Sequence, residues 1–492
     1  MTDAAILEHS PKIPSAEPTL LIAGEWRHGA SHFEVHDPAT GEPLGTADVA
    51  SEADAAEALD AAVAAAPAWR DTQTEDRATL LRFAAHRIRA QVEPLAELMT
   101  RENGKPLGES RGEVLNCARI LEWSAEEARR AGGRVPPPAA HGPSIVLTSP
   151  VGPTLAIAPW NFPGSMYVRK IALALAAGCT VVAKPSDLTP LIAVAHSRLI
   201  AEELPAGALN VLTTTRPAEI TGVLLADPRL RKVSFTGSTR VGLTLGAGDG
   251  ARLRRVSLEL GGHSPAIVLP GADLERAAAG IVAAKFANNG QSCTAINRVY
   301  VSRADRNELT RLVVERTRAL RLGHGLTRGV SVGPLINEAA IAKVSRHVDD
   351  ARDRGAVVHA GGKPWQPDDE ALTGAYYEPT VLTDVPDDAV IGSEETFGPV
   401  LPIYDYDTVD EAIDKANGLE YGLAAYLWGS DLQSIWSTFS RLEFGVIGVN
   451  DPFPVRPELP FGGLKNSGQE REGGSEGISA YLETTSVSFR WA

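Results

Sequence analysis

A cysteine past the middle of the chain has the neighbours expected of a nucleophile. Cys293 closes the segment FANNGQSC, in which amide side chains and a glycine precede it. This context suits a backbone turn that presents a thiol, and backbone N–H groups can lower a thiol pKa from its usual value of about 8.5. The alternative is a small buried hydrophobe, which is what we expect for Cys117 and Cys179. The local residues alone leave both roles open for Cys293.

A carboxylate in an apolar segment is the candidate general base. Glu259 lies in VSLELGG, between Leu258 and Leu260. Apolar surroundings raise the pKa of a carboxyl group, which would suit it to take a proton from water. The alternative is an exposed carboxylate on an alternating strand.

An asparagine at the end of a predicted strand could stabilise a developing oxyanion. Asn161 lies in PWNFP, before the predicted helix that begins at MYVRK. Its amide N–H could point into a site where negative charge forms. Helix capping is the alternative, since asparagine is a common N-cap residue.

Two further segments could bind phosphate or ribose groups at the carboxyl ends of strands. Gly237 and Ser238 lie in FTGST, between a predicted strand and a helix, where free N–H groups can bind an anion. Lys184 ends the strand TVVAK, and Asp187 follows it, either facing a ribose or capping the helix that begins at Leu188-Thr189. No G-x-G-x-x-G fingerprint follows a predicted strand. No cluster has metal-ligand spacing, so we expect no metal.

Composition excludes several classes of protein. The chain has 492 residues and a formal net charge of -15, which opposes binding to nucleic acid. Three widely spaced cysteines argue against a disulfide framework. The N-terminus lacks the pattern of a signal peptide, and the most apolar stretch, Ile171–Ala183, is too short to cross about 30 Å of hydrocarbon. We therefore expect a cytoplasmic protein without membrane partners.

The elements that must position these residues alternate between strands and helices. A capping box at Ser51 and Asp54 begins an Ala-rich helix that we expect to end at Pro67. After a proline-rich stretch at 136–138, short β-rich runs alternate with helical ones, which is typical of parallel sheets covered by helices. The C-terminal SVSFRW alternates apolar and polar residues, as expected of a strand seeking a sheet edge, on this or another subunit.

Together these segments resemble the aldehyde dehydrogenase superfamily. PWNFP, VVAKPS, FTGST, LELGG, GQSC, EETFGP and PFGGLKNSG occur in that family's order, from about Leu20 to the C-terminus. The text around MYVRK, VSLELGG and KFANNGQSC is similar to the succinate-semialdehyde dehydrogenase branch. The resemblance implies an α/β fold with two Rossmann-like parallel-sheet domains and a small β oligomerisation element. It also implies a homodimer or homotetramer.

The resemblance also implies domain boundaries and roles. The expected divisions are a flexible arm at 1–17, a cofactor-binding domain at 18–130 and 152–261, a catalytic domain at 262–476, and an oligomerisation element at 131–151 and 477–492. Cys293 would be the nucleophile and Glu259 the base, with Asn161 and the Cys293 N–H as the oxyanion hole. The implied contacts to NAD, with NADP as the alternative cofactor, are Pro159, Trp160, Lys184, Asp187, Gly237, Ser238, Glu395 and Phe397. Asp187 favours NAD, because a carboxylate accepts hydrogen bonds from a ribose 2′-hydroxyl and repels a 2′-phosphate.

Departures from the branch concern the substrate. An Arg six residues before the Cys and a Ser in a late loop bind the substrate carboxylate in that branch, whereas Ala287 and Val455 stand here. Arg169 is retained, and the late loop gains Arg456. The expected substrate lining is Phe162, Met166, Arg169, Ala287, Val455 and Arg456.

These departures leave two substrates open, a carboxylate-tailed semialdehyde and a neutral aliphatic or aromatic aldehyde. A second departure places Glu470 in QEREGGSEG, where the family commonly has Gly. Three other classes are disfavoured by intact residues: a CoA-acylating relative by Glu259, a thioesterase-like hydrolase by Glu395 and Lys184, and an inactive binding protein by Cys293.

Overall fold

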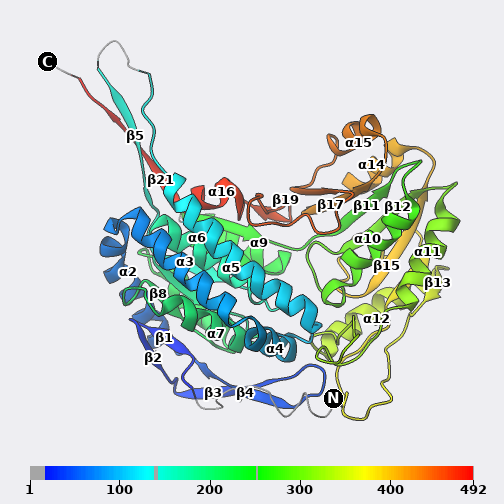
Figure 1. Cartoon of the computed structure of the whole chain (residues 1–492), viewed down its shortest axis with the longest axis horizontal. Coiled ribbons are helices and arrows are strands. Elements are labelled where there is room, and N and C mark those ends of the chain that lie inside the picture. The colour runs from blue at the N-terminus through cyan, green and yellow to red at the C-terminus, as the bar shows by residue number, and fades with distance from the viewer. Residues whose placement is uncertain (1–16, 138–141, 251–252, 491–492) are drawn as a thin grey trace.

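Two sheet-centred bodies lie side by side, and a two-stranded arm projects from one of them (Figure 1). The computed structural model describes residues 17–137, 142–250 and 253–490. Helices alternate with largely parallel sheets along the chain, which confirms the predicted α/β class. The expected flexible arm at 1–17 lies, except for Glu17, outside the described residues.

The first sheet has the order β2-β1-β8-β7-β6-β9-β10-β20. Its strands are β1 (Leu20–Ile22), β2 (Glu25–Arg27), β6 (Thr154–Ile157), β7 (Val181–Lys184), β8 (Leu209–Val211), β9 (Lys232–Thr236), β10 (Arg255–Glu259) and β20 (Gly468–Gln469). Strands β8, β7, β6, β9 and β10 are parallel. The chain runs outward from β6 to β8 and then crosses to β9 on the other side of β6. Parallel sheets bind ligands at the carboxyl ends of strands beside such a reversal.

The structure describes eight helices between Glu52 and Gly250. They are α2 (Glu52–Asp71), α3 (Thr74–Ala90), α4 (Val92–Asn103), α5 (Leu107–Arg130), α6 (Ser165–Ala177), α7 (Pro190–Ala201), α8 (Pro217–Ala226) and α9 (Thr239–Gly250). The predicted capping box at Ser51 and Asp54 is confirmed. The expected end at Pro67 is wrong, because α2 continues to Asp71 with the proline inside it. The buried Trp69 anchors this last turn in the core.

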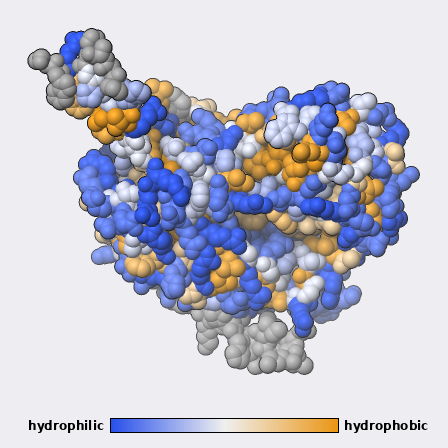
Figure 2. All heavy atoms as spheres, turned by 45° about the horizontal axis from the view of Figure 1, so that its top comes forward, coloured by the Kyte–Doolittle hydropathy of each residue, from blue (hydrophilic) through white to orange (hydrophobic). Residues whose placement is uncertain are grey.

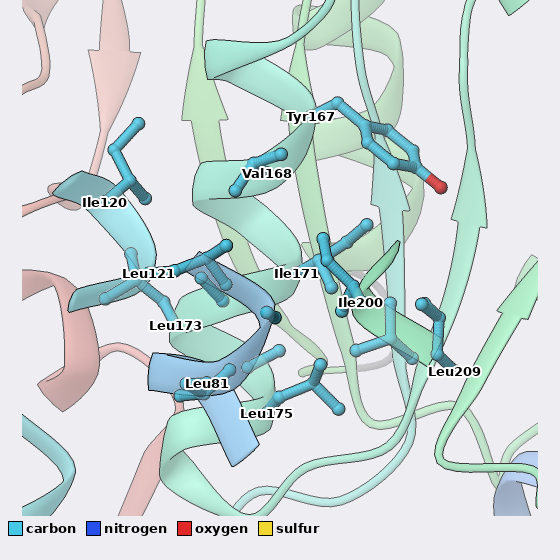
Figure 3. Close-up of a cluster of buried hydrophobic side chains, with 14 of the residues drawn as sticks. Leu81, Ile120, Leu121, Tyr167, Val168, Ile171, Leu173, Leu175, Ile200 and Leu209 are labelled. Carbon is cyan, nitrogen blue, oxygen red and sulfur yellow. The ribbon is translucent and has the colours of Figure 1, made fainter. Parts of the chain in front are cut away.

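Helix α6 runs through the centre of the main hydrophobic core. All 13 of its residues are buried. Figure 3 shows its Tyr167, Val168 and Ile171 in one cluster with Leu81 of α3 and Ile120 of α5. A helix that is apolar nearly all round belongs in a core, so a charged residue on it is held away from bulk water.

The second sheet has the order β13-β14-β15-β12-β11-β17-β18, and only β13 runs antiparallel to its neighbour. Its strands are β11 (Ser264–Val268), β12 (Ile296–Ser302), β13 (Val357–Ala360), β14 (Thr380–Thr383), β15 (Val400–Tyr406), β17 (Ala424–Trp428) and β18 (Val446–Val449). Its helices are α10 (Leu274–Phe286), α11 (Arg306–Arg318), α12 (Glu338–Asp353), α13 (Val390–Ser393), α14 (Val409–Asn417) and α15 (Leu432–Phe439).

The arm consists of β5 (Ser144–Pro150) and β21 (Leu482–Ser488), paired antiparallel from Leu482–Pro150 to Ser488–Ser144. The predicted C-terminal strand therefore pairs within its own chain, and Trp491 lies outside the described residues. The arm extends away from the body in both whole-molecule views (Figures 1 and 2). The remaining elements are β3 (Ser31–His36), β4 (Pro43–Val49), β16 (Tyr421–Gly422), β19 (Leu464–Lys465) and α16 (Gly474–Ser479).

Candidate active site

The carboxyl ends of the central parallel strands bring three of the predicted segments to one edge of the first sheet. Pro159 and Trp160 follow β6, Lys184 ends β7, and Gly237 and Ser238 follow β9. Strand β6 pairs with both β7 and β9, so these residues surround the reversal in strand order. The strand order of the sheet thus brings residues that are distant in sequence close together.

Lys184 and Asp187 differ in their surroundings. Lys184 is buried, and its Nζ donates to the main-chain oxygen of Pro185 at 3.0 Å. Asp187 is exposed and does not cap the following helix. Helix α7 begins at Pro190, and the Glu102 carboxylate accepts the N–H groups of Leu191 and Ile192, at 2.6 and 2.9 Å. The capping alternative for Asp187 is therefore wrong, and its exposed carboxylate accepts a 3.4 Å hydrogen bond from the neighbouring Ser186 hydroxyl.

The turn after β9 requires glycine and opens a helix. A Cβ on Gly237 would lie 2.5 Å from the ring of Phe235. The Gly237 N–H donates to the Glu259 carbonyl at 3.1 Å, which ties this turn to the end of β10. Ser238 caps α9 by accepting the N–H of Val241 at 3.4 Å. The N-terminus of α9 thus faces the same edge of the sheet.

Glu395 and Phe397 come to this edge from the second body. A Glu395 carboxylate oxygen accepts the N–H of Gly262 at 3.1 Å, and a Cβ on Gly261 would lie 2.8 Å from the other oxygen. Burial raises the pKa of Glu395 to about 7. The ring of Phe397 meets that of Trp160 edge to face, with centroids 5.6 Å apart.

Cys293 lies on a tightly held loop between α10 and β12. A 3-10 turn, η1 (Ala287–Gly290), leads into it, and Asn288 and Asn289 have left-handed backbones, with φ of 47° and 54°. Asn288 Nδ2 donates to the Asn161 carbonyl at 2.7 Å. A Cβ on Gly290 would lie 2.3 Å from the Gly398 carbonyl oxygen. The loop therefore packs against both PWNFP and EETFGP.

The environment of the thiol changes its pKa in the direction opposite to the one considered from sequence. Burial raises the pKa of Cys293 to about 12, and the carboxylates of Glu395 and Glu259 add to the increase. Its own backbone N–H and the Arg169 guanidinium oppose the shift without overcoming it. Cys117 and Cys179 are fully buried, as predicted.

Glu259 ends β10 and is 2% exposed. Neither carboxylate oxygen has a hydrogen-bond partner within the described chain. Burial, followed by the Glu472 carboxylate, raises the Glu259 pKa well above its usual value, while Lys170 and Arg169 oppose the increase. A Cβ on Gly462 would lie 2.6 Å from Glu259 Oε1. The predicted increase in pKa is confirmed.

Asn161 is buried at the junction between the two bodies. Its Nδ2 donates to the Gln291 carbonyl at 3.0 Å, which uses one of the two amide hydrogens. It does not cap α6, because Glu113 Oε1 accepts the N–H groups of Gly164 and Ser165, at 2.9 and 3.0 Å. The helix-cap alternative for Asn161 is therefore wrong.

A cavity of about 630 Å³ lies in front of the thiol. Most of its wall is apolar, and α5 and α6 form one side of it. The lining includes Glu109, Asn116, Arg119, Phe162, Met166, Arg169, Phe286, Ala287, Cys293, Tyr426, Phe453, Val455 and Phe461. Five of the six predicted substrate residues are among them.

Arg169 is the deeply buried cation of this cavity. It is 1% exposed, and none of its three guanidinium nitrogens has a hydrogen-bond partner among the described residues. Its Cζ lies 5.1 Å from the centre of the Phe461 ring. Burial lowers its pKa, with Glu472 and Glu259 as the main opposing charges. A guanidinium held in this way is suited to a carboxylate ligand.

Arg456, the sixth predicted residue, is not part of the lining. Its guanidinium pairs with Asp451 at 2.7 Å, and its side chain is exposed. The expectation that Arg456 lines the substrate cavity is therefore wrong, because Asp451 of its own loop holds it at the surface.

Arg119 was missed by the sequence reasoning. It lies on α5, is exposed, lines the cavity, and forms no ion pair within the described part of the chain. Nearby acidic groups are taken by other arginines, since Glu122 pairs with Arg89 and Glu126 with Arg82. The available signal was the spacing of Glu109, Asn116 and Arg119, which recur on one face of a helix.

Within the described residues, no helix has the length and apolar character needed to span a membrane, and no group of three or more His, Cys, Asp or Glu side chains is arranged to hold a metal ion.

Known proteins are similar to this chain over most of its length. The model of the Aldehyde dehydrogenase family matches residues 26–487. A succinate-semialdehyde dehydrogenase [NADP(+)] of Escherichia coli strain K12 is 42% identical over 467 residues, which cover 94% of this chain and 96% of that protein. A glutarate-semialdehyde dehydrogenase of Pseudomonas aeruginosa is 42% identical over 468 residues, with 94% and 95% covered. A solved structure titled as an E. coli NADP-dependent enzyme superposes with a TM-score of 0.94 at 40% identity, covering 97% of this chain and 99% of that one.

Proposed function

Because the chain belongs to the aldehyde dehydrogenase family, we propose that it oxidises a semialdehyde, an aldehyde that also carries a carboxylate, to a dicarboxylate with NAD(P). The observation that carries the choice of substrate is the Arg169 guanidinium, buried without a hydrogen-bond partner in the cavity that contains Cys293. An unpaired buried charge costs several kcal/mol, and a substrate carboxylate would offset that cost. The succinate- and glutarate-semialdehyde dehydrogenases among the relatives support this choice.

In the first half of the reaction, Cys293 attacks the aldehyde carbon and forms a tetrahedral thiohemiacetal. The carbonyl oxygen gains negative charge in this step. The second amide hydrogen of Asn161 and the backbone N–H of Cys293 are the donors that we assign to it. The Gln291 carbonyl fixes the Asn161 amide, so the donor needs no reorganisation during the reaction.

The acid–base chemistry follows from the two raised pKa values. A thiol with a pKa of about 12 is protonated at neutral pH, so its proton passes to solvent water as the thiolate attacks the aldehyde. Loss of hydride from the thiohemiacetal leaves a thioester on Cys293. Glu259, whose pKa is also raised, then accepts a proton from the water that attacks the thioester.

The residues at the edge of the first sheet fit a nicotinamide dinucleotide. The turn at Gly237 has no room for a Cβ, and Gly261 leaves space beside the Glu395 carboxylate. Ser238 and the N-terminus of α9 would hold the pyrophosphate, with Lys184 at the adenosine ribose and Glu395 at the nicotinamide ribose. The bound nicotinamide supplies the hydride acceptor. Pro159, Trp160 and Phe397 would enclose it and exclude water.

We propose a preference for NAD over NADP. The Asp187 carboxylate is exposed beside Lys184 and is free of helix capping. It would accept hydrogen bonds from a 2′-hydroxyl and repel a 2′-phosphate. The name of the E. coli relative specifies NADP(+), so this preference is a property we assign to the present chain alone.

A neutral aliphatic or aromatic aldehyde is the second candidate substrate. Ala287 and Val455 add small apolar surface to a cavity that is already mainly apolar. This alternative requires Arg169 to be satisfied by its stacking on Phe461 and by the charges of Glu472 and Glu259. Reduced-cofactor absorbance measured with matched pairs of a semialdehyde and a neutral aldehyde decides between them. Faster turnover of the neutral aldehydes in every pair would overturn the proposal.

We also propose a homo-oligomer, a dimer or tetramer, built through the arm. An isolated two-stranded ribbon is marginal in water, and Leu147 on β5 is 48% exposed. Trp436 on α15 is exposed as well, and apolar residues gather over the region of α14 and α15 in Figure 2.

The body around the first sheet would be the cofactor-binding domain and that around the second the catalytic domain. Three free cysteines agree with a cytoplasmic location.

A further inference from the structure

The first residue of β9 is a lysine buried in the first sheet. The side chain of Lys232 is 0% exposed, and its Nζ donates to Ser257 Oγ on β10 at 2.6 Å. It also lies 4.7 Å from the centre of the Tyr481 ring. Burial lowers the Lys232 pKa to about 8, opposed first by the carboxylate of Glu470 and less strongly by Cys179 and Glu472, while Arg255 adds to the decrease. A buried ammonium of this kind needs a nearby counter-charge.

Glu470 supplies that charge from an unfavourable backbone position. Its Oε2 lies 3.7 Å from Lys232 Nζ and accepts the hydroxyl of Ser257 at 3.3 Å. Its φ is 69°, in the left-handed region that favours glycine. A non-glycine residue held there has a strained backbone. The departure that places Glu where the family commonly has Gly thus adds a carboxylate at the expense of backbone strain.

The segment that carries Glu470 also forms the wall around the proposed base. Strand β20 pairs with β10 so that Gly468 lies opposite Glu259. Two residues after Glu470, the buried Glu472 accepts Lys170 Nζ at 2.5 Å. Main-chain bonds of 2.7 and 2.6 Å join Glu472 to Phe461, and a Cβ on the next residue, Gly462, would lie 2.6 Å from Glu259 Oε1. A shift of this segment would therefore move the surroundings of both Glu259 oxygens.

We propose that Glu470 is a positioning residue for Glu259: the chain of contacts Lys232–Ser257–Glu470 holds the segment 460–474 in register against β10 and so fixes the base for hydrolysis of the acyl-enzyme. This proposal rests on the proposed function. It assigns Glu470 no contact with substrate, cofactor or the reacting atoms. Its effect should therefore appear in release of the acyl group and not in its formation.

The competing explanation is that the ion pair between Lys232 and Glu470 only stabilises the fold. Two substitutions distinguish this explanation from a positioning role. Glu470→Gln removes the charge but keeps the strained side chain, whereas Glu470→Gly removes the charge and relieves the strain. A stabilising role predicts that stability alone changes. A positioning role predicts the same catalytic defect in both variants, although Glu470→Gly has the higher Tm of the two.

The matched control is Glu483→Gln. This substitution breaks the ion pair between Glu483 and Arg255, which has a 2.7 Å contact at the other end of β10. It removes one carboxylate, on β21, that pairs with the first residue of β10, but leaves the contacts of Glu470 in place. Its Tm, acyl-enzyme decay and steady-state kinetics should match those of the unaltered protein within about twofold.

The experiment uses full-length protein and two ways to load Cys293. Succinate semialdehyde with NAD reports the burst of reduced cofactor, and 4-nitrophenyl acetate acylates a thiol without cofactor. For both Glu470 variants we expect an unchanged burst, acyl-enzyme decay slowed about tenfold, and lower kcat with unchanged kcat/KM. Unchanged decay in both variants overturns the proposal, as does an equal slowing of the burst.

Failure of the proposed function gives a different result. An unaltered protein that shows no burst with any semialdehyde, but is acylated by the ester, refutes the substrate assignment. The decay of its acetyl-enzyme still tests Glu470. A protein that the ester does not acylate at Cys293 refutes the nucleophile and the positioning role together.

Discussion

Replacing Arg169 with leucine tests whether its buried guanidinium binds the substrate carboxylate. The effect on protein stability is measured separately from the effect on catalysis. The three guanidinium nitrogens have no hydrogen-bond partner in the described part of the chain, so a substrate carboxylate would be their first strong acceptor. A hydrogen bond to a charged group contributes about 1.5–3 kcal/mol. Since about 1.4 kcal/mol corresponds to a factor of ten, kcat/KM for a semialdehyde should fall roughly 10- to 100-fold.

The same substitution should not destabilise the protein. Leucine on α6 would pack against Phe461 without the desolvation cost of an unpaired charge, so we expect an equal or higher Tm. The assay compares kcat/KM for succinate semialdehyde and for butanal, together with thermal unfolding. A loss for succinate semialdehyde alone, at unchanged Tm, is the expected result.

Arg77→Leu is the control for removing a buried arginine. The Arg77 guanidinium donates to the main-chain oxygens of Ala176 and Thr72, at 3.2 and 2.5 Å, so its removal leaves buried carbonyls without donors. It should lower Tm and leave the ratio of the two substrates unchanged. Equal losses for both substrates in Arg169→Leu, accompanied by a lower Tm, would refute the carboxylate-binding role.

Three further predictions concern pH, the cofactor and the arm. The kcat/KM of the enzyme should rise as pH increases above about 7, because the raised pKa of Cys293 means that the thiol ionises only as pH increases; stopped-flow assays that show a flat or falling profile would contradict this. Asp187→Ser should raise the NADP-to-NAD ratio of kcat/KM about tenfold, and an unchanged ratio would leave Asp187 without a cofactor role. Deleting 482–490 should lower the molar mass measured by light scattering, whereas an unchanged mass would remove the arm from the interface.

Sequence reasoning recovered the parts of the site that lie in short segments with strong local constraints. At Gly237 a Cβ would meet the ring of Phe235, which lies only two residues earlier in the same segment. The apolar segment around Glu259 predicts a buried strand, and Glu259 ends β10 and is buried. Such features depend on residues close in sequence.

Features set by partners distant in sequence were predicted less well. The raised pKa of Cys293 depends on carboxylates that the fold brings together, and Arg456 is held by Asp451 outside the cavity. The N-terminus of α6 is capped by Glu113 of another helix, which frees Asn161 from that task. Helix α2 continues through Pro67 because the following turn is anchored in the core. In each case a tertiary contact outweighs a local preference.

The central claim is that Cys293 carries an acyl group that Glu259 releases. Mixing the Glu259→Gln variant with succinate semialdehyde and NAD should give a burst of about one reduced cofactor per chain and then stop, because hydride loss does not need the base whereas hydrolysis does. Mass spectrometry of the digested protein should find the succinyl adduct on the peptide that contains Cys293, and Cys293→Ala should show neither burst nor adduct. Continued turnover by Glu259→Gln, or a burst with no adduct on Cys293, would contradict the account.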